Sequence, residues 1–125
     1  MAVKLNSKQI AVLAILESFP PRFDQIHRLI EEMGSLRIDE SQVRRLTRML
    51  DEMKAAAQSV GESGIADSLG VMATLSRRTG GLQTRVRGLR EGLGALKTNF
   101  EGAMRAATTP VKDVEEEEET PKPPG

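Results

Sequence analysis

Hydrophobic residues recur every three or four positions along most of the chain, which is the spacing of one helix face. The clearest case is a face made of Val43, Leu46, Met49, Leu50, Met53, Ala57 and Val60. No segment of useful length alternates hydrophobic and polar residues as a strand does. The pattern therefore predicts an all-α protein, a small bundle of four to five helices of which the last is long.

Capping residues and breaks divide this pattern into five helical segments. The expected helices run from Asn6 or Ser7 to the residues before Pro20, from about Arg22 to Gly34, from Asp39 or Ser41 to about Gly61, from about Ile65 to the break at Thr79, and from about Leu82 to Ala107. We expect the two consecutive prolines, Pro20 and Pro21, to break the helix and to push Phe19 out of the helical conformation. The third and fifth helices are alike in length, which suggests that they pack as long antiparallel neighbours.

The last helix combines a hydrophobic seam with an unusual number of glycines. At about 100° per residue, one narrow face holds Leu82, Val86, Leu89, Leu93, Leu96 and Phe100. Beside this seam lies a strip of small residues, here called the glycine strip, which consists of Gly88, Gly92, Ala95, Asn99 and Gly102. Each interior glycine costs a helix about 1 kcal/mol relative to alanine, so close packing must offset the cost. The strip is expected to face either another helix of the same chain or a helix of a partner.

Charge is distributed unevenly, although eighteen basic and eighteen acidic residues cancel over the 125 residues. Residues 77–107 hold seven basic residues and two acidic ones, a net charge of +5, whereas residues 108–125 have a net charge of −4. The latter segment carries four prolines and five consecutive glutamates, Glu115, Glu116, Glu117, Glu118 and Glu119. We therefore divide the chain into a helical domain, 1–107, and a disordered acidic tail, 108–125, whose glutamates are expected to fold back on the basic face.

The chain lacks the residues that several classes of protein need for their function. The chain has no cysteine, which removes disulfides and thiolate metal sites and agrees with a reducing compartment such as the cytoplasm. No run approaches the roughly 18 apolar residues that span a bilayer, so we expect no membrane segment. With one histidine and no glycine-rich phosphate loop after a strand, we expect no enzyme, no catalytic or metal-binding residue and no cofactor.

The single histidine, His27, raises the question of histidine phosphotransfer, which uses an exposed histidine on a helix of a four-helix bundle. Members of that family usually have a lysine three positions and a glycine four positions after the histidine, where this chain has Ile30 and Glu31. A carboxylate at that position would repel a phosphoryl group. The segment "MATLSRRTGGL" resembles the active-site helix of the same family with Thr74 in place of histidine, which implies docking without phosphotransfer.

These observations favour a non-enzymatic protein–protein interaction module, an adaptor or regulatory scaffold of bacterial signalling or localisation. The residues expected to bind the partner, another protein or a second copy, are Arg85, Gly88, Arg90, Gly92, Ala95, Asn99 and Gly102, with the acidic tail tuning access. The first alternative is nucleic-acid binding through the arginines between Arg77 and Arg90, although no aromatic residue lies among them. A phosphotransfer-like docking domain is the second alternative.

Overall fold

The computed structural model describes residues 5–78 and 81–110. Its helices are α1 (Ser7–Leu16), α2 (Pro20–Gly34), α3 (Glu40–Ser59), α4 (Ser63–Arg77) and α5 (Leu82–Thr108). Helices are the only regular secondary structure in the described part of the chain, which confirms the predicted all-α bundle with a long last helix. The predicted disorder of the acidic tail concerns residues that, from 111 onward, lie outside the described ranges.

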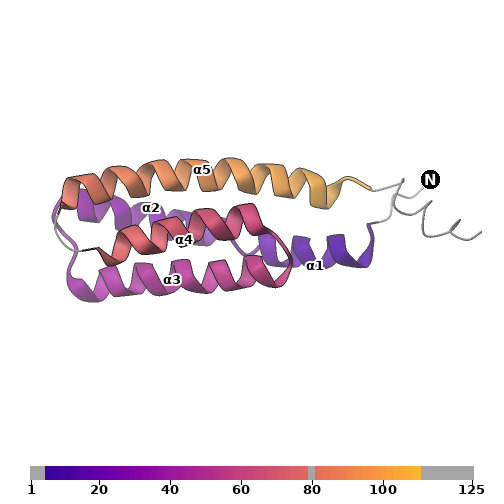
Figure 1. Ribbon diagram of the computed structural model, residues 1–125, viewed down its shortest axis with the longest axis horizontal. Coiled ribbons are helices and arrows are strands. Elements are labelled where there is room, and N and C mark those ends of the chain that lie inside the picture. Colours follow the sequence, from indigo (N-terminus) through magenta and orange to yellow (C-terminus); the bar gives the residue numbers. More distant parts are fainter. Residues whose placement is uncertain (1–4, 79–80, 111–125) are drawn as a thin grey trace, which may run out of the picture.

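The helices form an elongated bundle in which α3, α4 and α5 follow one another in alternating direction (Figure 1). α1 and α2 lie along successive parts of α5, and α2 also contacts α3. α3 and α5 lie diagonally and point the same way, so the prediction that they are antiparallel neighbours is wrong. The short connections between α3 and α4 and between α4 and α5 reverse the chain, and for this reason α4 is the antiparallel neighbour of both α3 and α5.

The predicted caps of α1 and α3 are confirmed. The Asn6 Oδ1 atom accepts a hydrogen bond from the Gln9 amide at 2.7 Å, and the Asp39 Oδ1 atom accepts one from the Gln42 amide at 2.9 Å. In both cases the glutamine side chain returns the bond to the backbone amide of the capping residue. Each capping box satisfies two backbone amides that the first helical turn would otherwise leave unpaired.

The start of α2 differs from the sequence prediction. The helix begins at Pro20 rather than near Arg22, and Phe19 has helical angles, φ −81° and ψ −39°. A proline in the first turn lacks an amide that would have no partner there, so it fits this position well. Burial accounts for the conformation of Phe19: the side chain is fully buried, and its ring lies 6.1 Å from that of Phe23 and 6.4 Å from that of Phe100.

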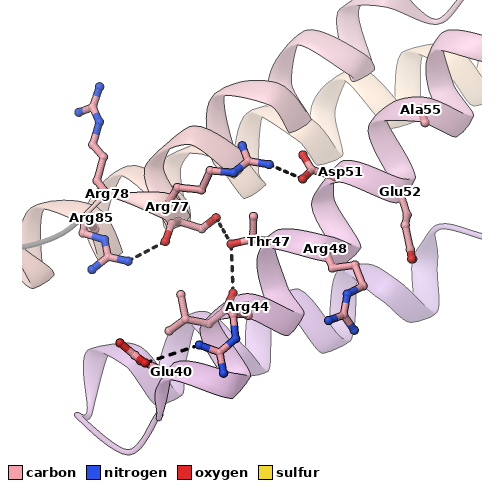
Figure 2. A pocket seen from close by; sticks show the side chains of 12 residues that line it. Glu40, Arg44, Thr47, Arg48, Asp51, Glu52, Ala55, Arg77, Arg78 and Arg85 are labelled. Atoms are coloured by element: carbon pink, nitrogen blue, oxygen red, sulfur yellow. Dashed lines mark hydrogen bonds and ion pairs between the residues drawn. The ribbon is translucent and has the colours of Figure 1, made fainter.

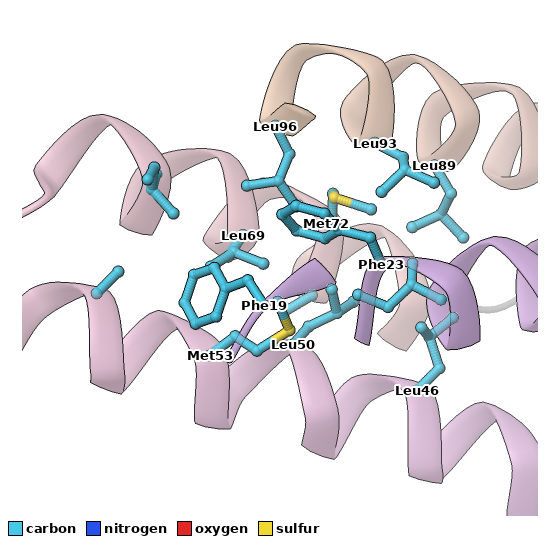
Figure 3. Packing of buried hydrophobic residues seen from close by; sticks show 14 of the residues in the cluster. Phe19, Phe23, Leu46, Leu50, Met53, Leu69, Met72, Leu89, Leu93 and Leu96 are labelled. Atoms are coloured by element: carbon cyan, nitrogen blue, oxygen red, sulfur yellow. The ribbon is translucent and has the colours of Figure 1, made fainter. Parts of the chain in front are cut away.

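The core is continuous and draws on every helix. Figure 3 shows its centre, where side chains of α5 meet those of α2, α3 and α4; the residues labelled there are Phe19, Phe23, Leu46, Leu50, Met53, Leu69, Met72, Leu89, Leu93 and Leu96. The predicted seam of α5 is confirmed, because Val86, Leu89, Leu93 and Leu96 are buried while Leu82 and Phe100 are partly buried against the cluster.

A buried polar contact joins α1 to the end of α5. The side chain of Gln9, which is 7% exposed, donates from Nε2 to the carbonyl oxygens of Ala106 at 3.1 Å and Thr109 at 2.5 Å. The last carbonyls of a helix have no partner within the helix, so this amide satisfies one of them, that of Ala106, together with the carbonyl of the capping residue Thr109. The contact also fixes the place where the chain leaves the bundle, beside α1.

Candidate docking surfaces

At Gly88 and Gly92, the glycine strip packs against another helix of the same chain. A Cβ atom at Gly88 would lie 2.8 Å from Leu75 Cδ1, and one at Gly92 would lie 2.7 Å from Met72 Cγ. Both neighbours belong to α4. Gly88 and Gly92 therefore contribute to close packing within the bundle. Because they have no side chains, α4 and α5 can approach each other closely at these positions.

The rest of the glycine strip is more open. Ala95 is exposed, and the Asn99 Nδ2 atom donates a hydrogen bond to Ser68 Oγ on α4 at 3.0 Å. A Cβ atom at Gly102 would meet only Arg105 Nη2 of its own helix, at 4.0 Å. The strip thus passes from a tight contact with α4 at Gly88 and Gly92 to a solvent-facing surface near the end of α5.

Arg90 connects α5 to α2. Its guanidinium donates two hydrogen bonds to the carboxylate of Glu31, from Nε to Oε2 at 2.9 Å and from Nη2 to Oε1 at 3.0 Å. These bonds, more than the charge of Arg90, lower the pKa of the Glu31 carboxyl below its ordinary value, and the same contact raises the pKa of Arg90. The arginine also covers Gly34, whose Cβ atom would lie 3.0 Å from Nη2.

Arg85 connects α5 to α4 rather than to α2. Its Nε atom donates to the Leu75 carbonyl oxygen at 3.2 Å, and its Nη2 atom donates to the Ser76 carbonyl oxygen at 2.7 Å. These carbonyls belong to the last turn of α4, where a positive charge is favourable. Arg85 and Arg90 were predicted to belong to one partner-binding face, but they make contacts with different helices.

A groove not expected from the sequence lies along α3 and the end of α4 (Figure 2). It has a volume of about 930 Å³. We call it the arginine groove, and it is lined by Glu40, Val43, Arg44, Thr47, Arg48, Asp51, Glu52, Ala55, Ser76, Arg77, Arg78 and Arg85. The α3 residues follow one another at three and four positions or in adjacent pairs, so they form a single face of that helix. Of the residues predicted to bind a partner, only Arg85 belongs to this groove.

The floor of the arginine groove is made by small polar side chains. Ser76 is 1% exposed, and its Oγ atom lies 2.6 Å from Thr47 Oγ1 across the junction of α3 and α4. Each hydroxyl has a single proton, so one of them donates across the junction while the other donates to a carbonyl of its own helix, that of Val43 for Thr47 or that of Ala73 for Ser76. All buried side-chain polar atoms of the described residues have a hydrogen-bond partner, so the floor is internally satisfied.

Five arginines and three carboxylates line the arginine groove. Arg44 pairs with Glu40 at 3.5 Å, and Arg77 pairs with Asp51. Arg48 and Arg78 are exposed and, within the described ranges, have no carboxylate at ion-pair distance. Figure 2 shows these two guanidinium groups directed outward from different helices. The groove therefore offers two unpaired arginines to solvent, beside others whose charges are partly compensated.

The sequence contained one signal for this surface. Arg44 and Arg48 are one turn apart on α3, and Arg77 and Arg78 end α4. The two pairs lie in different segments of the sequence, and only the hairpin of α3 and α4 places them along one groove. The candidate residues of phosphotransfer lie outside the groove: His27 is an exposed residue of α2, and Thr74 is exposed on α4, where its hydroxyl donates to the Gly70 carbonyl.

Two further findings concern the described residues alone. They contain no group of three or more histidines, cysteines, aspartates or glutamates placed to hold a metal ion. Among their helices, none is both long enough and apolar enough to cross a membrane. The tail residues predicted to act electrostatically, Glu115 to Glu119, lie outside the described ranges.

No protein-family model, curated protein or solved structure matches this chain.

Proposed function

We propose that this protein is a non-enzymatic interaction module that binds an acidic segment of another protein in the arginine groove. The observation that carries the proposal is that five arginines line one groove and that three of them, Arg48, Arg78 and Arg85, have no carboxylate partner among the described residues, while Arg85 alone of these three donates to backbone carbonyls. Guanidinium groups bind carboxylates through paired hydrogen bonds, which makes arginine the preferred residue at such sites.

The dimensions of the arginine groove fit an extended peptide. From Glu40 to Ala55, α3 advances fifteen residues, or about 22 Å at 1.5 Å per residue. An extended chain covers this length in about seven residues, at roughly 3.3 Å each. Val43 and Ala55 add apolar surface between the charged positions. A peptide of about seven residues with several carboxylates is therefore the best match in length and charge.

Nucleic acid is the second candidate, and the groove supports it less well. Glu40, Asp51 and Glu52 line the same surface and would repel phosphates. The residues that line the groove include no aromatic side chain on which a base could stack. The groove carboxylates oppose an acidic peptide less than a nucleic acid, because a flexible peptide can place its own carboxylates between them. The lack of aromatic side chains does not disfavour a peptide, which has no bases to stack.

This proposal moves the docking surface away from the glycine strip. α4 covers Gly88 and Gly92, so a partner helix could not reach them without displacing it. Binding by the open end of the strip, near Asn99 and Gly102, stays a prediction. The absence of cysteine supports a reducing compartment, and the cytoplasm is the location we propose.

The test uses two fluorescein-labelled probes, a peptide of seven glutamates and a mixed-sequence DNA of about twenty nucleotides, at low salt where charge pairs are least screened. We expect the peptide to bind saturably. Replacing two groove arginines, Arg48→Glu with Arg78→Glu, is expected to weaken binding by about tenfold or more. The matched control, Arg28→Glu with Lys97→Glu, makes the same charge change at exposed positions outside the groove and should bind as wild type. Equal loss in both variants, or preferential binding of DNA, would refute the proposal.

A further inference from the structure

We infer that the acidic segment bound by the arginine groove is residues 113–119 of a second copy of this chain. This inference rests on the proposed function and identifies the partner. It has three supports: the charge of that segment, its length, and the position from which the tail leaves the bundle.

Charge and length both agree with the groove. Residues 113–119 read "DVEEEEE" and contain six carboxylates in seven residues, with Val114 as the single apolar side chain. Fully extended, seven residues cover about 23 Å, which matches the roughly 22 Å of α3 along the groove. The segment is also the densest run of carboxylates in the chain. Each feature that defined the best ligand of the groove is thus present in the same protein.

The tail is too short to lie along the whole groove of its own molecule. It follows α5, which ends at Thr108, whereas Arg85 lies in the first turn of the same helix. The 23 positions from Arg85 to Thr108 correspond to about 35 Å of helix. Glu119 is nine residues beyond Pro110, so its backbone can lie at most about 32 Å from that of Pro110, even in a fully extended chain. The backbone of the acidic run therefore stops short of Arg85 in its own molecule, whereas the tail of a second copy has no such limit.

The same contact also limits the kinds of assembly. A tail from one copy that enters the groove of the next leaves the second tail and the first groove unoccupied. These two can bind each other, which closes a dimer, or bind further copies, which extends the assembly. Association is expected to be weak and sensitive to salt, because exposed charge pairs contribute little individually and are screened.

The experiment combines two full-length variants that each lack one half of the contact. The groove variant carries Arg48→Glu and Arg78→Glu and keeps its tail, and the tail variant has glutamine in place of Glu115 to Glu119 and keeps its groove. Sedimentation equilibrium at low salt should show that the mass of the wild type rises with protein concentration. Each variant alone should remain a monomer. An equimolar mixture should form a complex of two molecules and no larger one, because neither variant can extend the chain.

Each alternative outcome counts against the inference. A wild type that stays monomeric, a variant that associates alone, or a mixture that does not associate would overturn it. The control variant, Arg28→Glu with Lys97→Glu, should associate like the wild type. If circular dichroism shows that the groove variant is unfolded, Arg48→Gln with Arg78→Gln takes its place, with a smaller expected loss.

Failure of this inference can be told apart from failure of the proposed function. The peptide of seven glutamates is added to the tail variant, whose groove is intact. If the peptide binds and the mixture does not associate, the proposed function stands and the partner is another protein. If the peptide also fails to bind, both proposals fall.

Discussion

Two glycines of α5, only two residues apart, should respond in opposite ways to the same substitution. A Cβ atom at Gly92 would lie 2.7 Å from Met72 Cγ, whereas one at Gly94 would have no described atom within 4 Å apart from its chain neighbours and the nearby backbone of α5. Both glycines are inside the helix, so each substitution by alanine brings the same gain in helix propensity, about 1 kcal/mol. The difference between the two variants therefore measures the contact between α4 and α5.

The expected loss of stability in Gly92→Ala depends on whether Met72 can move away from the added methyl group. Cγ of Met72 is close to the backbone and the side chain is fully buried, so it cannot move away without disturbing the core. Overpacking of this kind costs about 1–3 kcal/mol, which exceeds the gain in propensity. We expect Gly92→Ala to destabilise the protein by about 1 kcal/mol and Gly94→Ala to stabilise it by about 1 kcal/mol. Gly88→Ala should be nearly neutral, since its neighbour is a terminal methyl group of the half-buried Leu75.

Urea unfolding followed by circular dichroism measures these free energies, and thermal melts should separate Gly92→Ala from Gly94→Ala by roughly 8 °C. A Met72→Ala background provides an internal check, because it removes Cγ. There, Gly92→Ala should become stabilising. If Gly92→Ala and Gly94→Ala were equally stable in the wild-type background, α4 and α5 would not be in close contact and the account of the glycine strip would be refuted.

Three further predictions concern polar contacts. Gln9→Met should cost about 1–2 kcal/mol in urea unfolding and speed hydrogen exchange in the last turn of α5, because the side chain bonds carbonyls there; unchanged exchange would contradict the bond. The lowered pKa of Glu31 implies stability that is present above about pH 4.3, where glutamate ordinarily titrates, and is lost as the pH falls through the folded pKa. NMR titration of Arg90→Gln should return the pKa of Glu31 toward its ordinary value, and a midpoint that does not move would exclude Arg90 as the cause. Ser76→Ala should cost about 1 kcal/mol without changing the affinity for the seven-glutamate peptide, because the Ser76 side chain on the groove floor is 1% exposed and its hydroxyl is bonded to Thr47; a weaker affinity would show that this hydroxyl contacts the peptide.

Features that depend on a few neighbouring residues could be predicted from the sequence. The caps at Asn6 and Asp39 and the hydrophobic seam of α5 are of this kind, because a helix period and a capping side chain act within one or two turns. The start of α2 was misplaced because local rules for the residue before a proline were overridden by burial. Phe19 keeps a helical conformation with its ring inside the core.

Features that depend on how helices are placed could not be predicted in the same way. The sequence showed that Gly88 and Gly92 face something close, but the identity of that neighbour depends on the connection between α4 and α5. The arginine groove depends even less on local sequence. Arg48 and Arg78 are thirty positions apart and line the same groove only because α3 and α4 form a hairpin. A prediction of helix adjacency would have been needed to find it.

The contact between Gln9 and the end of α5 has a consequence for the order in which the chain folds. It joins residues 100 positions apart, whereas α4 packs against both of its neighbours in sequence, α3 and α5. Closing the longer loop loses more chain entropy, so the hairpins of α3, α4 and α5 should form first and α1 should dock after the main kinetic barrier. Stopped-flow measurements on Gln9→Met should then show faster unfolding with little change in the folding rate. α1 precedes the other described helices in the sequence but would be the last of them to dock.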